Sequence, residues 1–136
     1  MKIRGVQNTD CTSVLDVSGS FDTILFLMNG IGMAESLPGL DVLLDKLKSL
    51  LNKGGQVLLD SSDMIYLFDG DVPELDSYYG ELEYRLRYED QDSGWFKWLY
   101  IDFETLRSVC LNKGFHCTLL EEGPHFDYLA QLQLID

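Results

Sequence analysis

The fold of this chain is decided by residues 21–33, which read FDTILFLMNGIGM. The run is apolar from Ile24 to Met28 and then reaches a Gly-x-Gly pair, Gly30 and Gly32. A strand that is apolar throughout is typical of a sheet that is covered on both faces. A strand that leads into a glycine pair is also how many nucleotide-binding turns begin. These residues therefore predict a buried strand, and they raise the question of what the two glycines do.

Two helices are predicted after this strand, and each leads directly into a further strand. Leucines between Leu40 and Leu51 recur at the spacing of one helix face. A second helix is expected to begin near Asp102, a residue type that suits an N-cap. Both helices are followed by Asn-Lys-Gly, a typical helix stop, at 52–54 and 112–114. The strands predicted after these stops are 56–60 and 115–120.

A β-hairpin is predicted between these two units. Apolar and charged side chains alternate along 81–89, which is the period-two pattern of a half-buried strand. Its expected partner is 95–101, with the turn at 90–94, and a last strand over 128–135 is expected to pair antiparallel with 115–120. The order of elements predicts an α/β fold with a mostly parallel sheet, a reversed last strand and a β-hairpin.

Composition limits the classes of function. The 136 residues, of which 46% are hydrophobic, are enough for a single domain, 1–136. Ten basic against 23 acidic residues give a formal net charge of −13, which argues against nucleic acid and anionic membranes as partners. No apolar stretch is long enough to span a bilayer, so we expect an acidic, cytoplasmic protein. The cysteines and histidines lack the spacing of metal ligands, and no metal site is predicted.

One interpretation of the glycine pair is a dinucleotide-binding turn. Gly30 and Gly32 would then approach a phosphate, and Asp60, at the tip of the next strand, would hold a ribose hydroxyl. The sequence departs from that motif, because Glu35 occupies the position of the third glycine. The predicted helix also starts too late for its N-terminal amides to face the ligand. Binding of NAD is therefore the least favoured interpretation.

A second interpretation comes from resemblance to a known family. SFDTILFLMNGIG at 20–32, the leucine-rich helix and LLNKGGQVLLDSSD at 50–63 resemble the fourth strand, the following helix and the fifth strand of class I S-adenosylmethionine-dependent methyltransferases. FHCTLLEEGPHFDYLAQLQL at 115–134 is similar to the reversed sixth and seventh strands of that family. The resemblance implies a partial Rossmann-like methyltransferase sheet, in which the β-hairpin is an insertion.

The resemblance also implies that part of the family pattern is missing. The family's acidic-Gly-x-Gly turn and its acidic ribose-binding residue should precede residue 21, where 20 residues leave no room for them. It therefore implies the C-terminal part of a methyltransferase domain, through truncation, a late start codon or a split gene. The implied cofactor is S-adenosylmethionine, bound weakly by this chain alone. The alternative is a non-catalytic α/β module that serves dimerisation or interaction.

Candidate site residues follow from the rule that open α/β sheets bind ligands outside the carboxyl ends of their strands. After the first strand these residues are Met28, Asn29, Gly30, Ile31 and Gly32. The resemblance implies that they border the methionine part of the cofactor and the acceptor substrate. Glycine would allow the backbone to approach the ligand closely, and the Asn29 amide could orient a polar acceptor. A plain Asn-Gly turn is the open alternative.

The residues after the next strand form the predicted substrate-binding group, Asp60, Ser61, Asp63 and Tyr66. We expect a small-molecule acceptor there. The open alternative is that the serine and aspartate residues cap a short helix that follows. Asp60, Asp63, Tyr66 and His125 are candidate bases, but their spacing singles out none of them, so the catalytic residue is unknown.

A partner is predicted from the position of the first strand in the sheet. Without upstream strands, 24–28 would lie at an edge, where unpaired amides invite another chain. We therefore predict a homodimer, or association with a missing N-terminal half, through this strand or through residues 1–17 docked beside it.

Overall fold

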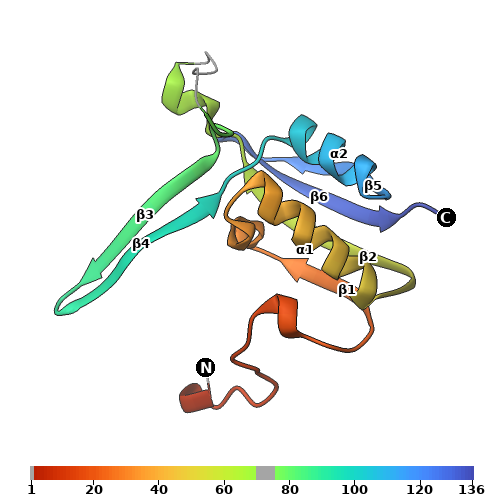
Figure 1. Cartoon of the computed structure of the whole chain (residues 1–136), viewed down its shortest axis with the longest axis horizontal. Coiled ribbons are helices and arrows are strands. Elements are labelled where there is room, and N and C mark those ends of the chain that lie inside the picture. Colours follow the sequence, from red (N-terminus) through yellow and green to blue (C-terminus); the bar gives the residue numbers. More distant parts are fainter. Residues whose placement is uncertain (1, 70–75) are drawn as a thin grey trace.

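Residues 2–69 and 76–136 are described by the computed structural model, which places four strands in one sheet and two in a separate hairpin (Figure 1). Short 3-10 helices are written η. In chain order, the elements are η1 Lys2–Arg4, η2 Val14–Asp16, β1 Phe21–Phe26, η3 Gly30–Ala34, α1 Leu37–Leu50, β2 Leu51–Ser62, η4 Met64–Phe68, β3 Glu81–Tyr88, β4 Gln91–Leu99, α2 Phe103–Asn112, β5 Phe115–Glu122 and β6 Asp127–Leu134.

The four-stranded sheet has the order β1-β2-β6-β5. β1 pairs with β2 in parallel, with Leu25 opposite Leu58. β6 pairs antiparallel with β2, with Ala130 opposite Leu59, and antiparallel with β5. Three strands therefore run in one direction and the last runs in the other, as an α/β fold with a mixed sheet requires. The predicted fold class is confirmed at this level.

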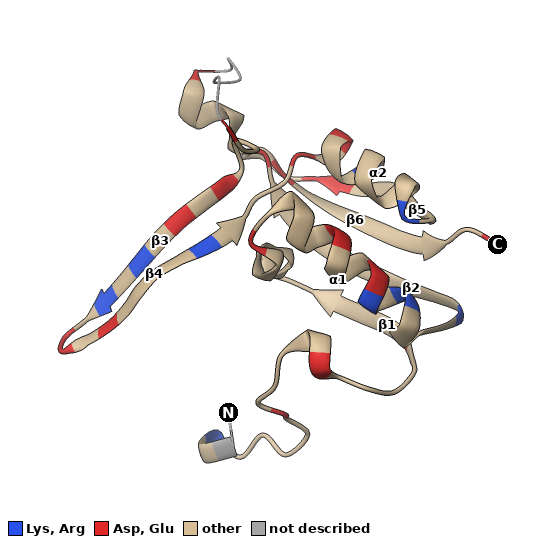
Figure 2. Cartoon of the chain, viewed as in Figure 1, with Lys and Arg blue, Asp and Glu red and all other residues tan. Residues whose placement is uncertain are grey.

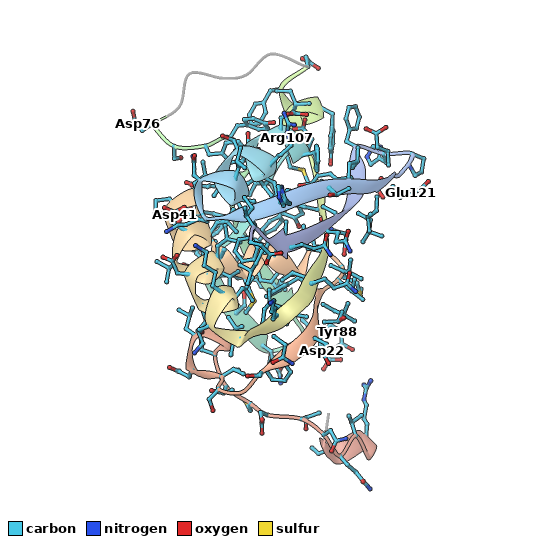
Figure 3. The ribbon with its side chains drawn as sticks, turned by 90° about the vertical axis from the view of Figure 1, so that its right-hand side faces the viewer. Asp22, Asp41, Asp76, Tyr88, Arg107 and Glu121 are labelled. Atoms are coloured by element: carbon cyan, nitrogen blue, oxygen red, sulfur yellow. The ribbon has the colours of Figure 1, made fainter. Side chains whose placement is uncertain are left out.

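Both helices lie on the same face of this sheet (Figures 1 and 3). α1 is capped by Ser36, whose Oγ accepts from the Gly39 N–H at 3.1 Å, and α2 is capped by Asp102. α1 ends at Leu50, before the predicted Asn-Lys-Gly stop. No helix in the described part of the chain is long and apolar enough to cross a membrane. The core between the helices and the sheet contains Phe26, Ile31, Leu40, Leu43, Leu44, Leu47, Val57, Leu59, Leu106, Cys110, Phe115, Tyr128, Ala130 and Leu132.

The opposite face of β1 is only partly covered by the residues that the structure describes. Leu25 is 55% exposed, and Met28, in the turn after β1, is 90% exposed. The expectation that both faces of this strand are covered is therefore wrong within the described residues. The reason is that β1 pairs with β2 along one edge, while α1 and α2 occupy a single face of the sheet. Some apolar side chains of this run therefore stay exposed in the part of the chain that the structure describes.

The β3–β4 hairpin projects away from the sheet (Figure 1). Its predicted turn at 90–94 is wrong, because Tyr88 pairs with Gln91 and the chain reverses between them. Asp92 instead lies within β4, where it accepts hydrogen bonds from the Gly94 N–H at 2.9 Å and from Arg85. The polar residues that suggested a turn therefore belong to β4, where side-chain hydrogen bonds hold them.

Candidate functional site

The turn after β1 is built around Asn29. Met28 and Asn29 both have left-handed backbone, with φ of 57° and 56°, which costs most residues roughly 1 kcal/mol or more. The Asn29 N–H donates to Asp60 Oδ2 at 3.0 Å, and Asn29 Oδ1 accepts from Ser62 Oγ at 3.2 Å. The Asn29 carbonyl accepts from Trp98 Nε1 at 3.0 Å. These bonds stabilise the strained turn and join the carboxyl ends of β1 and β2 to the hairpin.

The two glycines of this turn have different roles. A Cβ at Gly32 would lie 2.0 Å from Trp98 Nε1, so this buried glycine makes room for the indole. The space beside Gly32, which the sequence assigned to a cofactor, holds the Trp98 indole. A Cβ at Gly30 would make an ordinary 3.7 Å contact with Phe26, and Gly30 is not required for space. Between the glycines, Ile31 is fully buried in the core and presents no surface to a ligand.

The dinucleotide interpretation loses its geometric basis at the same turn. The short helix η3 begins at Gly30 itself, and Glu35 ends it with a φ of 70°. α1 begins only at Leu37, and its N-terminal N–H donates to Glu81 Oε1 at 2.8 Å. The first amide of the helix is thus directed at a carboxylate of the hairpin. A phosphate bound at the glycine pair would need that amide as a hydrogen-bond donor, but the amide already donates to Glu81.

The end of β2 separates two of the predicted substrate-binding residues. β2 continues to Ser62, so Ser61 lies inside the strand and Asp60 and Ser61 point to opposite faces of the sheet. Ser61 is fully buried, and its Oγ accepts from the Ile101 N–H at 3.1 Å. The Ser61 hydroxyl thus satisfies a buried amide and is not exposed to solvent, so Ser61 is left out of the substrate-binding residues that we propose. Asp60 is half-buried at the Asn29 turn.

Asp63 combines a capping role with a tyrosine contact. Its Oδ1 accepts from the Ile65 N–H at 3.0 Å, which confirms that it caps the short helix η4. The same oxygen accepts from the Tyr79 hydroxyl at 2.6 Å. Burial, and then the hydrogen bond to Asp63, raise the pKa of Tyr79, so its hydroxyl is a donor at neutral pH. This contact joins separate elements, so it leaves no local pattern by which the role of Tyr79 could be predicted.

Tyr66 lies in an aromatic cluster with His125 and Phe126. Its ring centroid is 5.0 Å from that of His125 and 5.2 Å from that of Phe126. The Phe126 carbonyl accepts from the Asp63 N–H at 2.9 Å, so this cluster adjoins the start of η4. The structure thus brings three of the candidate bases, Asp63, Tyr66 and His125, to one region. Asp60 makes its contact at the Asn29 turn instead.

Tyr78 and Asp102 form a second tyrosine–carboxylate pair that the sequence did not reveal. The Tyr78 hydroxyl donates to Asp102 Oδ1 at 2.5 Å and accepts from the Asp102 N–H at 2.9 Å. Burial opposes ionisation of Asp102, but hydrogen bonds from Thr105 and Tyr78 outweigh it and lower the pKa of the carboxyl. Burial also raises the pKa of Tyr78. Asp102 is therefore an anion held at the start of α2, where the helix dipole favours it.

Comparison with solved structures places this architecture among known folds. A SAM-dependent methyltransferase from Bacteroides fragilis, crystallised with S-adenosyl-L-homocysteine, superposes with a TM-score of 0.88 and 40% sequence identity over 99% of this chain. The chain has a class I methyltransferase fold. It spans 57% of the length of the Bacteroides protein. The resemblance that the glycine strand, the leucine-rich helix and the closing strands indicated is thus confirmed.

More distant structures agree on the methyltransferase fold alone. A S-adenosylmethionine-dependent methyltransferase from Clostridium acetobutylicum has a TM-score of 0.65 and 11% identity, covering 99% of this chain and 68% of that protein. SAM-dependent methyltransferases from Methanosarcina mazei give a TM-score of 0.57 and 12% identity, covering 92% of this chain and 66% of that one. No protein-family model and no curated protein sequence matches the chain.

Proposed function

We propose that this chain is part of an S-adenosylmethionine-dependent methyltransferase and that the turn after β1 forms one wall of the cofactor site. The observation that carries the proposal is the 40% identity, over 99% of the chain, to a methyltransferase crystallised with S-adenosyl-L-homocysteine.

The side chains at this edge fit such a wall in part. Met28 is 90% exposed, and the half-buried Asp60 carboxylate uses Oδ2 for the Asn29 N–H. An apolar thioether beside a carboxylate suits a ligand that combines apolar surface with positive charge. Gly32 packs against the Trp98 indole, and Ile31 is buried. The cofactor-binding residues that we propose are therefore Met28, Asn29 and Gly30. We therefore expect weak cofactor binding by this chain alone.

The chain's own residues would position the reactants. Bound S-adenosylmethionine supplies a methyl group on a reactive sulfonium, so catalysis depends mainly on alignment. In this proposal the hydrogen-bonded Asn29 turn fixes the cofactor side. The region of Asp63, Tyr66 and His125 then borders a small-molecule acceptor, and no base is assigned. Tyr79 keeps Asp63 in place by its 2.6 Å hydrogen bond.

Nuclear magnetic resonance of the 15N-labelled chain tests the proposal, because it detects weak binding residue by residue. With S-adenosylhomocysteine at millimolar concentration, we expect amide shifts at 28–30 and at 60–62, and smaller shifts with NAD at the same concentration. Shifts confined to other elements, or equal shifts with both ligands, would contradict the cofactor assignment. The matched variants Asn29→Ala and Asn52→Ala separate the turn from a half-buried asparagine outside it, which lies near the start of β2 and donates to Asp22.

The uncovered edge of β1 supports a second candidate function, an interaction module. Leu25 and Leu27 are 55% and 52% exposed, and β1 has a strand neighbour on one side within the described residues. We propose that a second copy of the chain, or the remaining part of a methyltransferase, covers this edge. Sedimentation at low micromolar concentration tests the second copy: Leu25→Lys should shift a dimer to monomer and Leu86→Lys on the hairpin should not. A monomeric parent chain would contradict the dimer.

A further inference from the structure

The connection between β1 and α1 is strained at three positions. Met28, Asn29 and Glu35 have positive φ angles of 57°, 56° and 70°, although none of them is glycine. Such backbone conformations persist only when the surrounding structure holds them. The contacts that other elements make with this connection therefore decide whether the turn at 28–30, which is the cofactor wall of the proposed function, keeps its shape.

The base of the β3–β4 hairpin, residues 81–82 and 98–99, contacts the first end of this connection. The indole of Trp98 fills the space beside Gly32, where a Cβ would lie 2.0 Å from Nε1. The same Nε1 donates to the Asn29 carbonyl at 3.0 Å, and that carbonyl also accepts from the Gly32 N–H at 3.0 Å. The indole therefore joins the strained turn and η3 at a single oxygen.

The hairpin base also contacts the second end of the connection. Glu81 begins β3, and its Oε1 accepts from the Leu37 N–H, the first amide of α1, at 2.8 Å. Leu82, the next residue, lies opposite Trp98 in the pairing of the two strands. Figure 1 shows the inner end of β4 beside the connection, and β4 contacts η3 directly. Two neighbouring positions of the hairpin thus hold the connection at both of its ends.

We propose that Trp98 and Glu81 are positioning residues for the cofactor, so that the hairpin base sets the shape of the cofactor wall. This inference rests on the proposed function of the turn after β1. Without the two contacts the strained connection would adopt other conformations, and only a fraction of the molecules would present Met28, Asn29 and Gly30 to the ligand. The apparent affinity falls in proportion to that fraction. Neither positioning residue touches the cofactor in this proposal.

The variant Trp98→Phe tests the first contact, because phenylalanine keeps a ring beside Gly32 but has no N–H to donate. We expect the dissociation constant of S-adenosylhomocysteine, measured by titration of the 15N-labelled chain, to rise about two- to tenfold, the range for the loss of one hydrogen bond. Trp95→Phe is the matched control on the same strand, because Trp95 is 69% exposed, and it should leave the constant unchanged. A merely structural role of Trp98 would lower the stability to urea and leave the dissociation constant unchanged, and that outcome would overturn the proposal.

The contact of Glu81 is tested by rescue with a conservative variant. Glu81→Ala removes the acceptor of the Leu37 N–H and should weaken the binding of S-adenosylhomocysteine about two- to tenfold. Glu81→Gln keeps an acceptor oxygen and should restore most of the affinity. Glu83→Ala, at an exposed glutamate of the same strand, is the control and should bind as the parent does. Equal affinities of the alanine and glutamine variants would overturn the role of Glu81.

Hydrogen exchange without ligand separates this inference from the proposed function. In Trp98→Phe, the amides of Asn29 and Gly30 should exchange about two- to tenfold faster than in the parent, whereas the amide of Leu59 in the core should not. If the parent shows no ligand shifts at 28–30, the proposed cofactor site is wrong, and the exchange rates still show whether the hairpin holds the turn. If the parent binds and Trp98→Phe changes neither exchange nor affinity, the cofactor site stands and the inference fails.

Discussion

The four-stranded sheet and the β3–β4 hairpin carry the same alternation of apolar residues but differ in what covers it. Along β2, Val57 and Leu59 are fully buried beneath the helices. Along β3, Leu86 and Tyr88 continue the same alternation but are 62% and 74% exposed. A period-two pattern therefore specifies a strand and its two faces. Burial depends on whether another element lies over the face.

The hairpin is joined to the sheet mainly at its base. Trp98 packs against Gly32 and donates to the Asn29 carbonyl, and just after β4 the Ile101 N–H donates to Ser61 Oγ on β2 at 3.1 Å. Towards the tip, Figure 2 marks basic positions on β3 and acidic positions in the turn and on β4, and Arg87 lies opposite Asp92 in the pairing of the two strands. A two-stranded hairpin without further packing is only marginally stable in water. Substitutions should therefore have effects that decline from the sheet to the tip.

The largest expected effect is in the core of the sheet. Leu44→Ala removes a fully buried side chain of α1 and should lower the free energy of unfolding by about 2–5 kcal/mol. Leu86→Ala makes the same chemical change on the hairpin and should cost less than about 1 kcal/mol, because the side chain is exposed. Urea denaturation followed by circular dichroism measures both. Equal losses would mean that the hairpin is covered in solution.

The next effect is at the junction of sheet and hairpin. Gly32→Ala forces the Trp98 indole away from the Asn29 carbonyl and should cost about 1–3 kcal/mol. Gly30→Ala, where a Cβ meets ordinary contact, should cost less than about 1 kcal/mol. Tryptophan fluorescence should shift to longer wavelength in the first variant and not in the second. A similar outcome for both glycines would contradict the separate roles assigned to them.

A feature of this fold can be predicted from the sequence when the residues that form it lie close together along the chain. The leucine spacing of α1 and the Asp102 cap of α2 are signals within one turn of a helix, and both helices were predicted. The contacts of Trp98 with Gly32 and of Tyr79 with Asp63 join separate elements. They leave no local pattern, so they could not be predicted.

The end of β2 shows a different reason for error in the candidate site. A serine after an apolar run suggests the tip of a strand, yet Ser61 is buried within β2. Its hydroxyl is satisfied by the Ile101 N–H, which follows the hairpin in the chain. A buried hydroxyl is stable when it has such a partner. The identity of that partner depends on the tertiary fold, and a single sequence does not contain it.

A smaller effect is expected where the hairpin leads into α2. Asp102→Asn keeps a capping oxygen but removes the charge, and should cost about 1 kcal/mol or less at pH 7. The folded chain holds the pKa of Asp102 below its ordinary value of 3.8. The stabilisation is therefore present above about pH 4 and is lost as the pH falls through the folded pKa. Urea denaturation between pH 7 and pH 3 should show the two proteins converging at the acid end.

The smallest effect is expected at the tip of the hairpin. Arg87 is 66% exposed, and its Nε lies 3.2 Å from Asp92 Oδ2, which Arg85 also contacts. Exposed ion pairs contribute little, so Arg87→Ala should change the free energy of unfolding by about 0.5 kcal/mol or less. Thermal denaturation at low and high salt should agree for the variant and the parent. A larger loss of stability would show that another part of the protein packs over the tip and depends on this ion pair.

The Asn29 turn has a consequence for the chemical ageing of the protein. In flexible peptides, an asparagine before glycine deamidates readily, because the glycine nitrogen attacks the side-chain carbonyl and closes a succinimide ring. Here the Gly30 N–H donates to the Leu27 carbonyl at 3.0 Å, while Asn29 Oδ1 accepts from Ser62. Both groups that must meet are held in other bonds. The folded chain should keep its asparagine through long storage, and deamidation at this position would therefore mark molecules that have unfolded.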